Sequence, residues 1–313
     1  MNNKFIKYIG YIITIAAFIF IGKSLISMDL DVRYITNPLS AVIFIILMSI
    51  GYAIMVYVSS YAWKSILEFI NKDKIPFNEI TGVYVKSNIA KYLPGNFMHF
   101  AGRNLLAGKL GFKQLDITFC SILEILMLVF TSLILSCIFA MRSLKSSIEY
   151  VLTKVNISIV VAVILAVILV IAISIWFICK RTKFLKNYSH LFTKGFLKLL
   201  VKLFFIYGLT LVVPGVFLLL CLKLILSAQV SAGAITIIIF SYILSWVLGF
   251  IVPGAPGGVG IREALLIFIL TPFYTNSIVL LAAVLLRIIS TLGDLIAFIT
   301  EPVIIKYYNR GRK

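Results

Sequence analysis

A long uncharged stretch, interrupted by a segment rich in proline and glycine, constrains this chain most. Residues 224–261 carry no charge, and residues 264–286 carry none either. Such runs are typical of membrane-spanning helices, since about 20 apolar residues cross a bilayer. The interruption, VPGAPGGVGIRE at residues 252–263, cannot form a continuous helix. Because broken backbone at membrane depth is tolerated only when it is buried in protein or lines a wet cavity, we predict a functional site here.

Composition places the chain among polytopic membrane proteins. Of its 313 residues, 62% are hydrophobic and 13% are charged, whereas soluble domains carry about 25% charged residues. The net charge of +18 would suggest nucleic acid binding in a soluble protein. In a membrane protein it reflects basic cytoplasmic loops and attraction to anionic lipid, so we expect no nucleic acid partner. The four cysteines lie in apolar runs without metal-ligand spacing, and we predict neither a metal nor a cofactor.

The hydropathy pattern predicts spans at residues 8–26, 39–63, 115–141, 156–179, 203–226, 231–252 and 278–300, with residues 261–272 as a short returning helix. Residues 80–112 carry too much charge to cross the membrane and are too apolar for a free loop. They contain a second break, KYLPGNFMHFAGR, and are predicted to form a hairpin or an interfacial segment. The expected fold is therefore an all-α bundle of six to eight transmembrane helices in a single domain, 1–313, with two broken or re-entrant segments.

Charge predicts the orientation of the chain in the membrane. Both termini are basic, and residues 180–202 carry seven Lys or Arg and no acid. These regions should be cytoplasmic, in a multi-pass protein of the cell membrane. Residues 142–154, with three basic residues against one acidic residue, should then lie outside and disagree with the rule, but the other three regions outweigh them.

The order of elements also predicts an internal repeat. The sequence span, span, Pro-Gly break, span occurs at residues 8–141 and again at residues 156–300. Pro94 and Pro253 are 159 residues apart, and Leu115 and Ile278 are 163 apart. Because each copy makes three crossings, the second would start from the opposite side of the membrane. This is the pattern of an inverted-topology repeat with discontinuous helices at equivalent places.

The breaks contain the first group of candidate residues. Glycine-rich turns ahead of a helix can present backbone N–H groups to phosphate, although the same glycines could serve only close helix packing. The candidates for such an anion cradle are Gly254, Gly257, Gly258 and Gly260. The residues that should break the helices are Pro94, Gly95, Pro253 and Pro256.

Charged residues at membrane depth form the second group, because such groups usually face the bundle interior. Arg103 and Arg262 each follow a break by nine residues from its first proline and could hold a phosphate. Glu263 is expected to be a charge partner, a helix cap or a proton carrier. Glu124 could neutralise Arg103 or Arg287 or take up a proton. His99 is expected to be a satisfied structural histidine.

The last span carries a charged face of its own. Arg287, Asp294 and Glu301 recur every seven residues and therefore share one side of the helix. Arg287 is the deepest of the three and is expected to meet a ligand phosphate. Asp294 is predicted to be the counter-charge of Arg287 through a water or a neighbouring residue, and Glu301, near the cytoplasmic end, to be an interface residue.

Two motifs connect the chain with a known family. KYLPGNFMHFAGR, and VPGAPGGVGIREALL followed by LLRIIS, resemble the lysylphosphatidylglycerol synthase transmembrane region, also called the flippase-like domain family. The resemblance covers nearly the whole chain. It implies a membrane part that moves lipid between leaflets, while a separate soluble domain makes the aminoacylated lipid in bifunctional members. We expect a stand-alone member without that synthase domain and without lysyl transfer. The family pattern falls on Pro94, Gly95, Arg103, Pro253, Gly254, Gly257, Gly258, Gly260, Arg262, Glu263 and Arg287.

Together these features predict a translocase for an anionic phospholipid or a polyprenyl-phosphate-linked sugar. Its head group would bind at the midplane, on the three arginines, and one half would rock against the other. Two alternatives stay open. One is a non-catalytic membrane partner of a glycan- or lipid-synthesising enzyme. The other is a membrane-embedded head-group transferase using His99 or Glu124. The lipid substrate and the oligomeric state do not follow from the sequence.

Overall fold

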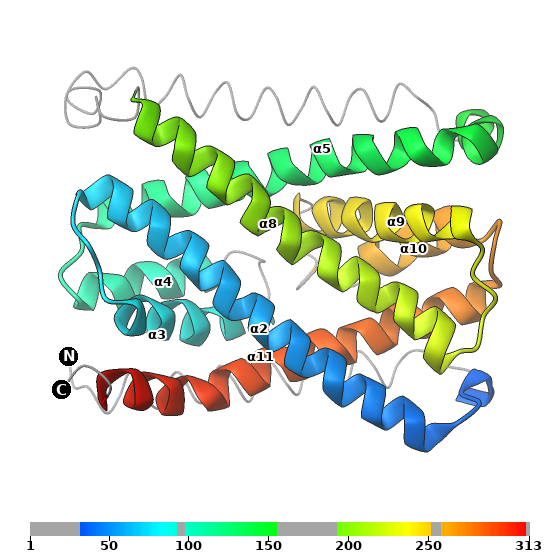
Figure 1. Cartoon of the computed structure of the whole chain (residues 1–313), viewed down its shortest axis with the longest axis horizontal. Helices are drawn as coiled ribbons and strands as arrows, with labels where there is room; N and C mark the ends of the chain where they lie inside the picture. Colours follow the sequence, from blue (N-terminus) through cyan, green and yellow to red (C-terminus); the bar gives the residue numbers. More distant parts are fainter. Residues whose placement is uncertain (1–31, 93–97, 155–192, 252–257, 259, 311–313) are drawn as a thin grey trace.

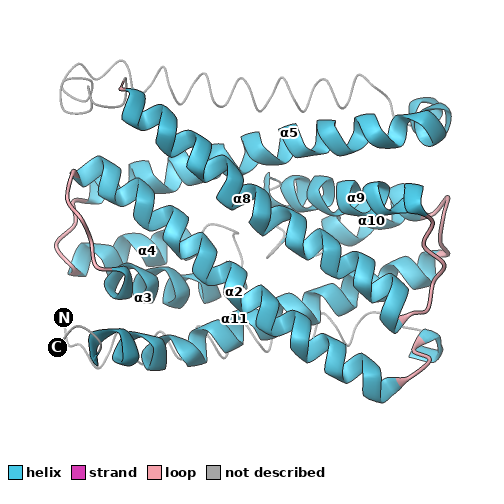
Figure 2. Cartoon of the chain, viewed as in Figure 1, coloured by secondary structure: helices cyan, strands magenta, loops and turns pink. Residues whose placement is uncertain are grey.

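The computed structural model describes residues 32–92, 98–154, 193–251, 258 and 260–310. Every regular element in these residues is a helix (Figure 2), which confirms the predicted all-α class. The predicted spans at residues 8–26 and 156–179 lie outside the described residues. The structure therefore describes only the other predicted spans.

Among the described residues, five helices are long and apolar enough to cross a membrane. They are α2 (Pro38–Asn71), α5 (Gln114–Lys154), α8 (Lys194–Leu220), α9 (Ala232–Ile251) and α11 (Asn276–Arg310). Most extend beyond the predicted limits. Residues 64–71, predicted as the start of a polar stretch, continue α2, and residues 142–154, predicted as a loop, continue α5.

Local capping fixes the ends of α2. The Asn37 side chain accepts a hydrogen bond from the Ser40 N–H at 3.2 Å, which satisfies one of the free donors of the first turn. At the other end, Lys72 adopts a left-handed conformation with φ of 61° and stops the helix. The far end of α8 continues as a π-helical turn, Cys221–Ile225 (η4). A short 3₁₀ turn, Val32–Tyr34 (η1), precedes α2.

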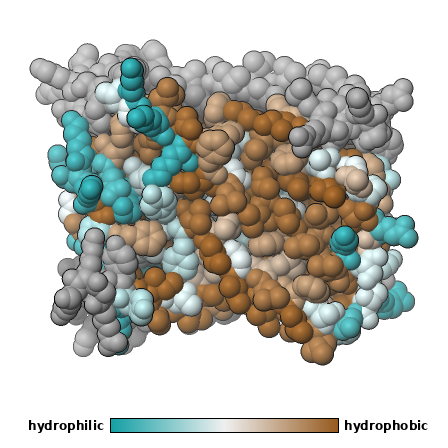
Figure 3. Space-filling view, viewed as in Figure 1, coloured by the Kyte–Doolittle hydropathy of each residue, from teal (hydrophilic) through white to brown (hydrophobic). Residues whose placement is uncertain are grey.

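The outer faces of α2 and α8 are apolar. Figure 3 shows a broad hydrophobic surface over these helices, with hydrophilic side chains toward the two ends of the bundle, most of them at the left. Large exposed side chains on this surface include Leu39, Ile43, Leu47, Leu197, Val201 and Phe205. An apolar face of this size on helices of this length is suited to contact with lipid.

Each predicted break is followed by a short helix that packs back against the helix before the break. Around the first break, α3 (Phe77–Asn88) continues into the 3₁₀ turn η2 (Ile89–Tyr92), and α4 (Met98–Lys109) packs back against α3. After the second break, α10 (Ile261–Leu270) packs against α9. In Figure 1, α3 and α4 lie at the left end of the bundle, while α9 and α10 lie at the right.

The helix contacts of residues 38–154 have counterparts in residues 194–310. Helix α2 packs against α3 as α8 packs against α9, and α4 contacts α5 as α10 contacts α11. Helix α11 contacts α2 and α3, while α5 contacts α8 and α9. Figure 1 shows that α2 and α8 run in opposite directions, and so do α5 and α11.

Helices α2 and α11 approach each other closely at Gly293. A Cβ atom placed on this glycine would lie 2.7 Å from the Tyr52 Cβ and 2.8 Å from the Ser49 carbonyl oxygen. Any larger residue at this position would therefore push the two helices apart. Small residues at helix crossings are typical of membrane bundles, where tight packing drives association.

Candidate functional site

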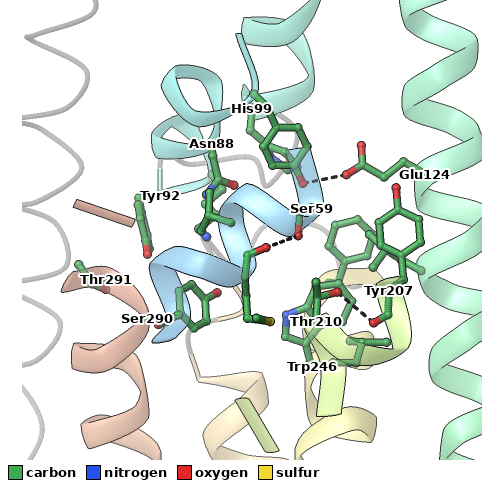
Figure 4. Close-up of a pocket in the computed structure, with 18 of the residues that line it drawn as sticks. Ser59, Asn88, Tyr92, His99, Glu124, Tyr207, Thr210, Trp246, Ser290 and Thr291 are labelled. Carbon is green, nitrogen blue, oxygen red and sulfur yellow. Dashed lines mark hydrogen bonds between the residues drawn. The ribbon is translucent and has the colours of Figure 1, made fainter. Parts of the chain in front are cut away.

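A cavity of about 170 Å³ lies where the helices around the two breaks, α3, α4, α9 and α10, meet α2, α5, α8 and α11. Figure 4 shows His99 from α4, Glu124 from α5, Tyr207 from α8 and Trp246 from α9 around it. A water molecule occupies about 30 Å³ in the liquid. The cavity thus has room for a hydrated phosphate-sized group and not for a lipid with its acyl chains.

The lining is both charged and aromatic. Its charged members are Lys91, Arg103, Glu124, Arg262 and Arg287. Its tyrosines are Tyr52, Tyr84, Tyr92, Tyr207 and Tyr242. The three arginines singled out in the sequence therefore line one cavity, although they are supplied by α4, α10 and α11.

Helix lengths indicate how deep the cavity lies. Helix α10 has ten residues, so it is about 15 Å long at 1.5 Å per residue. It begins next to Arg262 and ends at an exposed turn that includes Thr271 and Phe273. In a hydrocarbon core about 30 Å thick, a helix of this length places Arg262 near the middle if α10 runs along the membrane normal.

Arg103 and Glu124 form a buried ion pair between α4 and α5. Arg103 Nη1 donates to Glu124 Oε2, and each side chain is only 2% exposed. The Tyr84 hydroxyl donates to the other carboxylate oxygen at 3.0 Å. The guanidinium carbon of Arg103 also lies 3.9 Å from the centre of the Tyr84 ring. These contacts fix Arg103 and neutralise it.

Glu263 connects α10 to α11. Its Oε1 accepts from Arg287 Nε, and its Oε2 accepts from the Gly260 N–H at 2.7 Å. It is thus both a cap for α10 and a charge partner, two of the roles expected for it. The Arg287 Nη2 atom is buried and has no hydrogen-bond partner among the described residues.

Asp294 pairs directly with Lys91, while its predicted role as counter-charge of Arg287 through a water or a neighbour stays a prediction. Its carboxylate lies 2.7 Å from Lys91 Nζ and accepts from Asn88 Nδ2 at 2.7 Å and from the Tyr92 hydroxyl. Seven residues along a helix separate side chains by about 10 Å. Arg287 therefore faces α10, while Asp294 faces α3 and η2.

Arg262 differs from the other cations of the cavity. Within the part of the chain that the structure describes, no carboxylate lies within ion-pair distance of it, and its buried Nε has no hydrogen-bond partner. Its guanidinium carbon lies 5.6 Å from the Trp246 ring centre. A Cβ on Gly258, where φ is +74°, would lie 2.7 Å from Arg262 Nε. Gly258 is thus required both for its backbone conformation and for the approach of Arg262.

The remaining candidates divide into described and undescribed residues. His99 is buried and lines the cavity, and its Nδ1 has no hydrogen-bond partner among the described residues. Glu301 is buried against α3, and its predicted place at the membrane interface stays a prediction. Among the described residues no group of His, Cys, Asp and Glu could hold a metal ion. Outside the described residues lie Pro94, Gly95, Pro253, Gly254, Pro256 and Gly257, so the glycine cradle stays a prediction.

Sequence reasoning missed Lys91 and the aromatic lining. Lys91 stands three residues before Pro94 in the KYLPGN motif, so its nearness to the break was an available signal. The tyrosines carried no such signal, because they come from five separate segments that only the fold brings together.

One comparison with known proteins is decisive. The family model described as the lysylphosphatidylglycerol synthase TM region matches residues 8–297. The chain belongs to this family. The match includes both breaks, all three arginines of the cavity and Asp294. No curated protein and no solved structure matches the chain. The family and the apolar helices establish a multi-pass integral membrane protein.

Proposed function

We propose that this protein binds the anionic phosphate head group of a membrane lipid in the central cavity and moves the lipid between leaflets. The lipid would be an anionic phospholipid or a polyprenyl-phosphate-linked sugar. The observation that carries the proposal is Arg262, a half-buried cation of the cavity that has no carboxylate partner in the described part of the chain and whose Nε atom is buried.

The charge balance of the cavity supports an anionic ligand. Lys91, Arg103 and Arg287 each have a carboxylate partner, supplied by Asp294, Glu124 and Glu263 respectively. Among these described groups, Arg262 leaves one positive charge in excess. A cation without a negative partner is unfavourable away from bulk water, and a phosphate diester would place a negative group beside Arg262. The planar guanidinium suits phosphate because it can donate two parallel hydrogen bonds.

Unsatisfied hydrogen-bonding groups point to the same ligand class. The Arg262 Nε, the Arg287 Nη2 and the Tyr207 hydroxyl are buried without a partner among the described residues, and all three side chains line the cavity. Each can donate a hydrogen bond, so the cavity presents several donors that have no acceptor among the described residues. Phosphate oxygens are acceptors and would satisfy these groups.

We also propose that the halves 8–141 and 156–300 form the predicted inverted repeat. The matched helix contacts and the opposite directions of α2 and α8 support this proposal. The helices that follow the two breaks, α4 and α10, bring Arg103 and Arg262 to one cavity, as in transporters built on such repeats. Because the cavity is small, the acyl chains would stay in the bilayer while the head group crosses.

The positive-inside rule gives the orientation that we propose. Lys194, Lys198 and Lys202 lie near the start of α8, at the end of the bundle where α11 also terminates (Figure 1). We assign this end, with both chain termini, to the cytoplasmic side of the cell membrane.

Reconstitution into liposomes tests the proposed function. We expect the wild type to move fluorescent phosphatidylglycerol, measured as the fraction reached by a membrane-impermeant quencher. Arg262→Ala should slow this roughly 10- to 100-fold, since a hydrogen bond to a charged group contributes about 1.5–3 kcal/mol. Lys202→Ala is the control, because Lys202 is bonded to Tyr61 and Ser65 outside the cavity. Equal rates for wild type and Arg262→Ala would refute the proposal.

A further inference from the structure

Asp294 is the most enclosed carboxylate next to the cavity. It is 1% exposed, on the face of α11 that packs against η2, α3 and α2. From η2 it meets Lys91 and the Tyr92 hydroxyl, and from α3 it meets Asn88. From α2, Tyr52 lies beside this group, with its ring centre 5.7 Å from Lys91 Nζ.

Lys91 is shared between Asp294 and the cavity. Its ammonium group lies 2.7 Å from Asp294, yet its side chain is 23% exposed and lines the cavity. Among the described residues it is the one cation within ion-pair distance of Asp294. Arg287, on the same helix, already forms an ion pair with Glu263. A phosphate in the cavity therefore competes with Asp294 for the same ammonium group.

The loss of Lys91 has a chemical consequence for Asp294. A buried carboxylate without a cation is strongly unfavourable, and such a group takes up a proton instead. The proton from bulk water would bind a carboxylate oxygen of Asp294, while Lys91 keeps all its protons and turns to the phosphate. One negative charge and one proton then enter the site together, so its net charge does not change.

Glu301 gives this proton a second acceptor nearer the surface. It follows Asp294 by seven residues on the same face of α11 and is 1% exposed, and neither of its oxygens has a hydrogen-bond partner among the described residues. Lys86 of α3 lies 3.2 Å from it and is 50% exposed. On α2, the nearby titratable group is Tyr57, which donates to the Ala297 carbonyl at 2.9 Å. Glu301 thus lies between Asp294 and the end of the bundle where α11 terminates.

We propose that the protein couples the movement of an anionic lipid to that of a proton, which binds Asp294 and reaches it through Glu301. The inference rests on the proposed function and adds a driving force for the transport of the lipid. Because one proton accompanies one monoanionic head group, transport is electroneutral. A difference of one pH unit across the membrane corresponds to 1.36 kcal/mol. It therefore shifts the lipid distribution between leaflets about tenfold.

The test uses liposomes that contain fluorescent phosphatidylglycerol and an internal pH indicator. For the wild type we expect lipid to accumulate in the leaflet on the alkaline side, with one proton moved per lipid and no response to membrane potential. Asp294→Asn cannot take up the proton, so it should move lipid only to an equal distribution and give no proton signal. Glu301→Gln should slow the proton signal without changing the final ratio. Glu68→Gln is the control, because Glu68 pairs with Lys64 away from the cavity.

The results separate the two proposals. If Asp294→Asn still accumulates lipid tenfold per pH unit, the coupling is refuted while lipid movement stands. If Arg262→Ala moves phosphatidylglycerol like the wild type, the proposed function itself fails. Lys91→Gln is a second variant in case Asp294→Asn does not fold. It leaves Asp294 without its cation in every state and should also abolish the pH response. A wild-type pH response in Lys91→Gln would refute the coupling.

Discussion

The buried pair between Arg103 and Glu124 makes a quantitative prediction for Glu124→Gln. The substitution keeps the size of the side chain but leaves Arg103, at 2% exposure, without a negative partner. Removal of one member of a buried ion pair costs about 3–5 kcal/mol. The contact of Arg103 with the Tyr84 ring remains, so we expect a loss near the lower limit, about 3 kcal/mol. At about 2–4 °C per kcal/mol, the melting temperature should fall by at least about 6 °C.

Thermal unfolding in detergent, followed with a thiol-reactive dye, measures this effect. Cys120 and Cys221 are buried and become reactive only on unfolding, whereas the exposed Cys137 reacts from the start. The dye signal therefore reports the exposure of the core of the bundle.

Two variants show whether the charge is responsible. Arg103→Met combined with Glu124→Gln removes the unpaired cation and should be more stable than Glu124→Gln alone. Lys64→Gln breaks a more exposed pair, with side chains 13% and 26% exposed, and should cost at most about 1 kcal/mol. If Glu124→Gln melts within about 2 °C of the wild type, then Arg103 is not isolated from water and the reasoning is wrong.

Glycine substitutions provide two further predictions. Gly293→Ala should destabilise the protein by about 1–3 kcal/mol through collision with Tyr52, measured by the same thermal assay. The control is Gly233→Ala in α9, which meets nothing within 4 Å and should not destabilise the protein. Gly258→Ala and Gly260→Ala both strain a backbone with positive φ, by about 1–2 kcal/mol. Only Gly258→Ala should also weaken phosphate binding, measured by calorimetry, because its methyl group would displace the arginine of α10. Equal binding by the two variants would contradict this role for Gly258.

The sequence was sufficient for the helix breaks and the family. Proline and glycine stop helices by local geometry, so the positions of α4 and α10 after their breaks could be read from the chain. The ends of the helices were harder to predict from the sequence. Residues 64–71 appeared polar, but Lys64 and Glu68 form an ion pair one turn apart on a helix that continues through them.

The partner of each charge could not be predicted in the same way. The seven-residue spacing placed Arg287 and Asp294 on one face of α11, and this suggested that they pair. Their actual partners are Glu263 and Lys91. Each partner depends on which helix packs against α11 beside that residue. That choice is a tertiary contact, and no local pattern encodes it. The same holds for the tyrosines of the cavity.

The tight crossing at Gly293 has a consequence for how the protein could move. Helix α2 belongs to the first half and α11 to the second, so this crossing locks the halves together at backbone distance. A swing of one half as a rigid unit, as expected from the sequence, would have to break it. Exposure of the cavity to either leaflet is then better assigned to the short helices α3, α4 and α10, which can tilt against a framework that stays still.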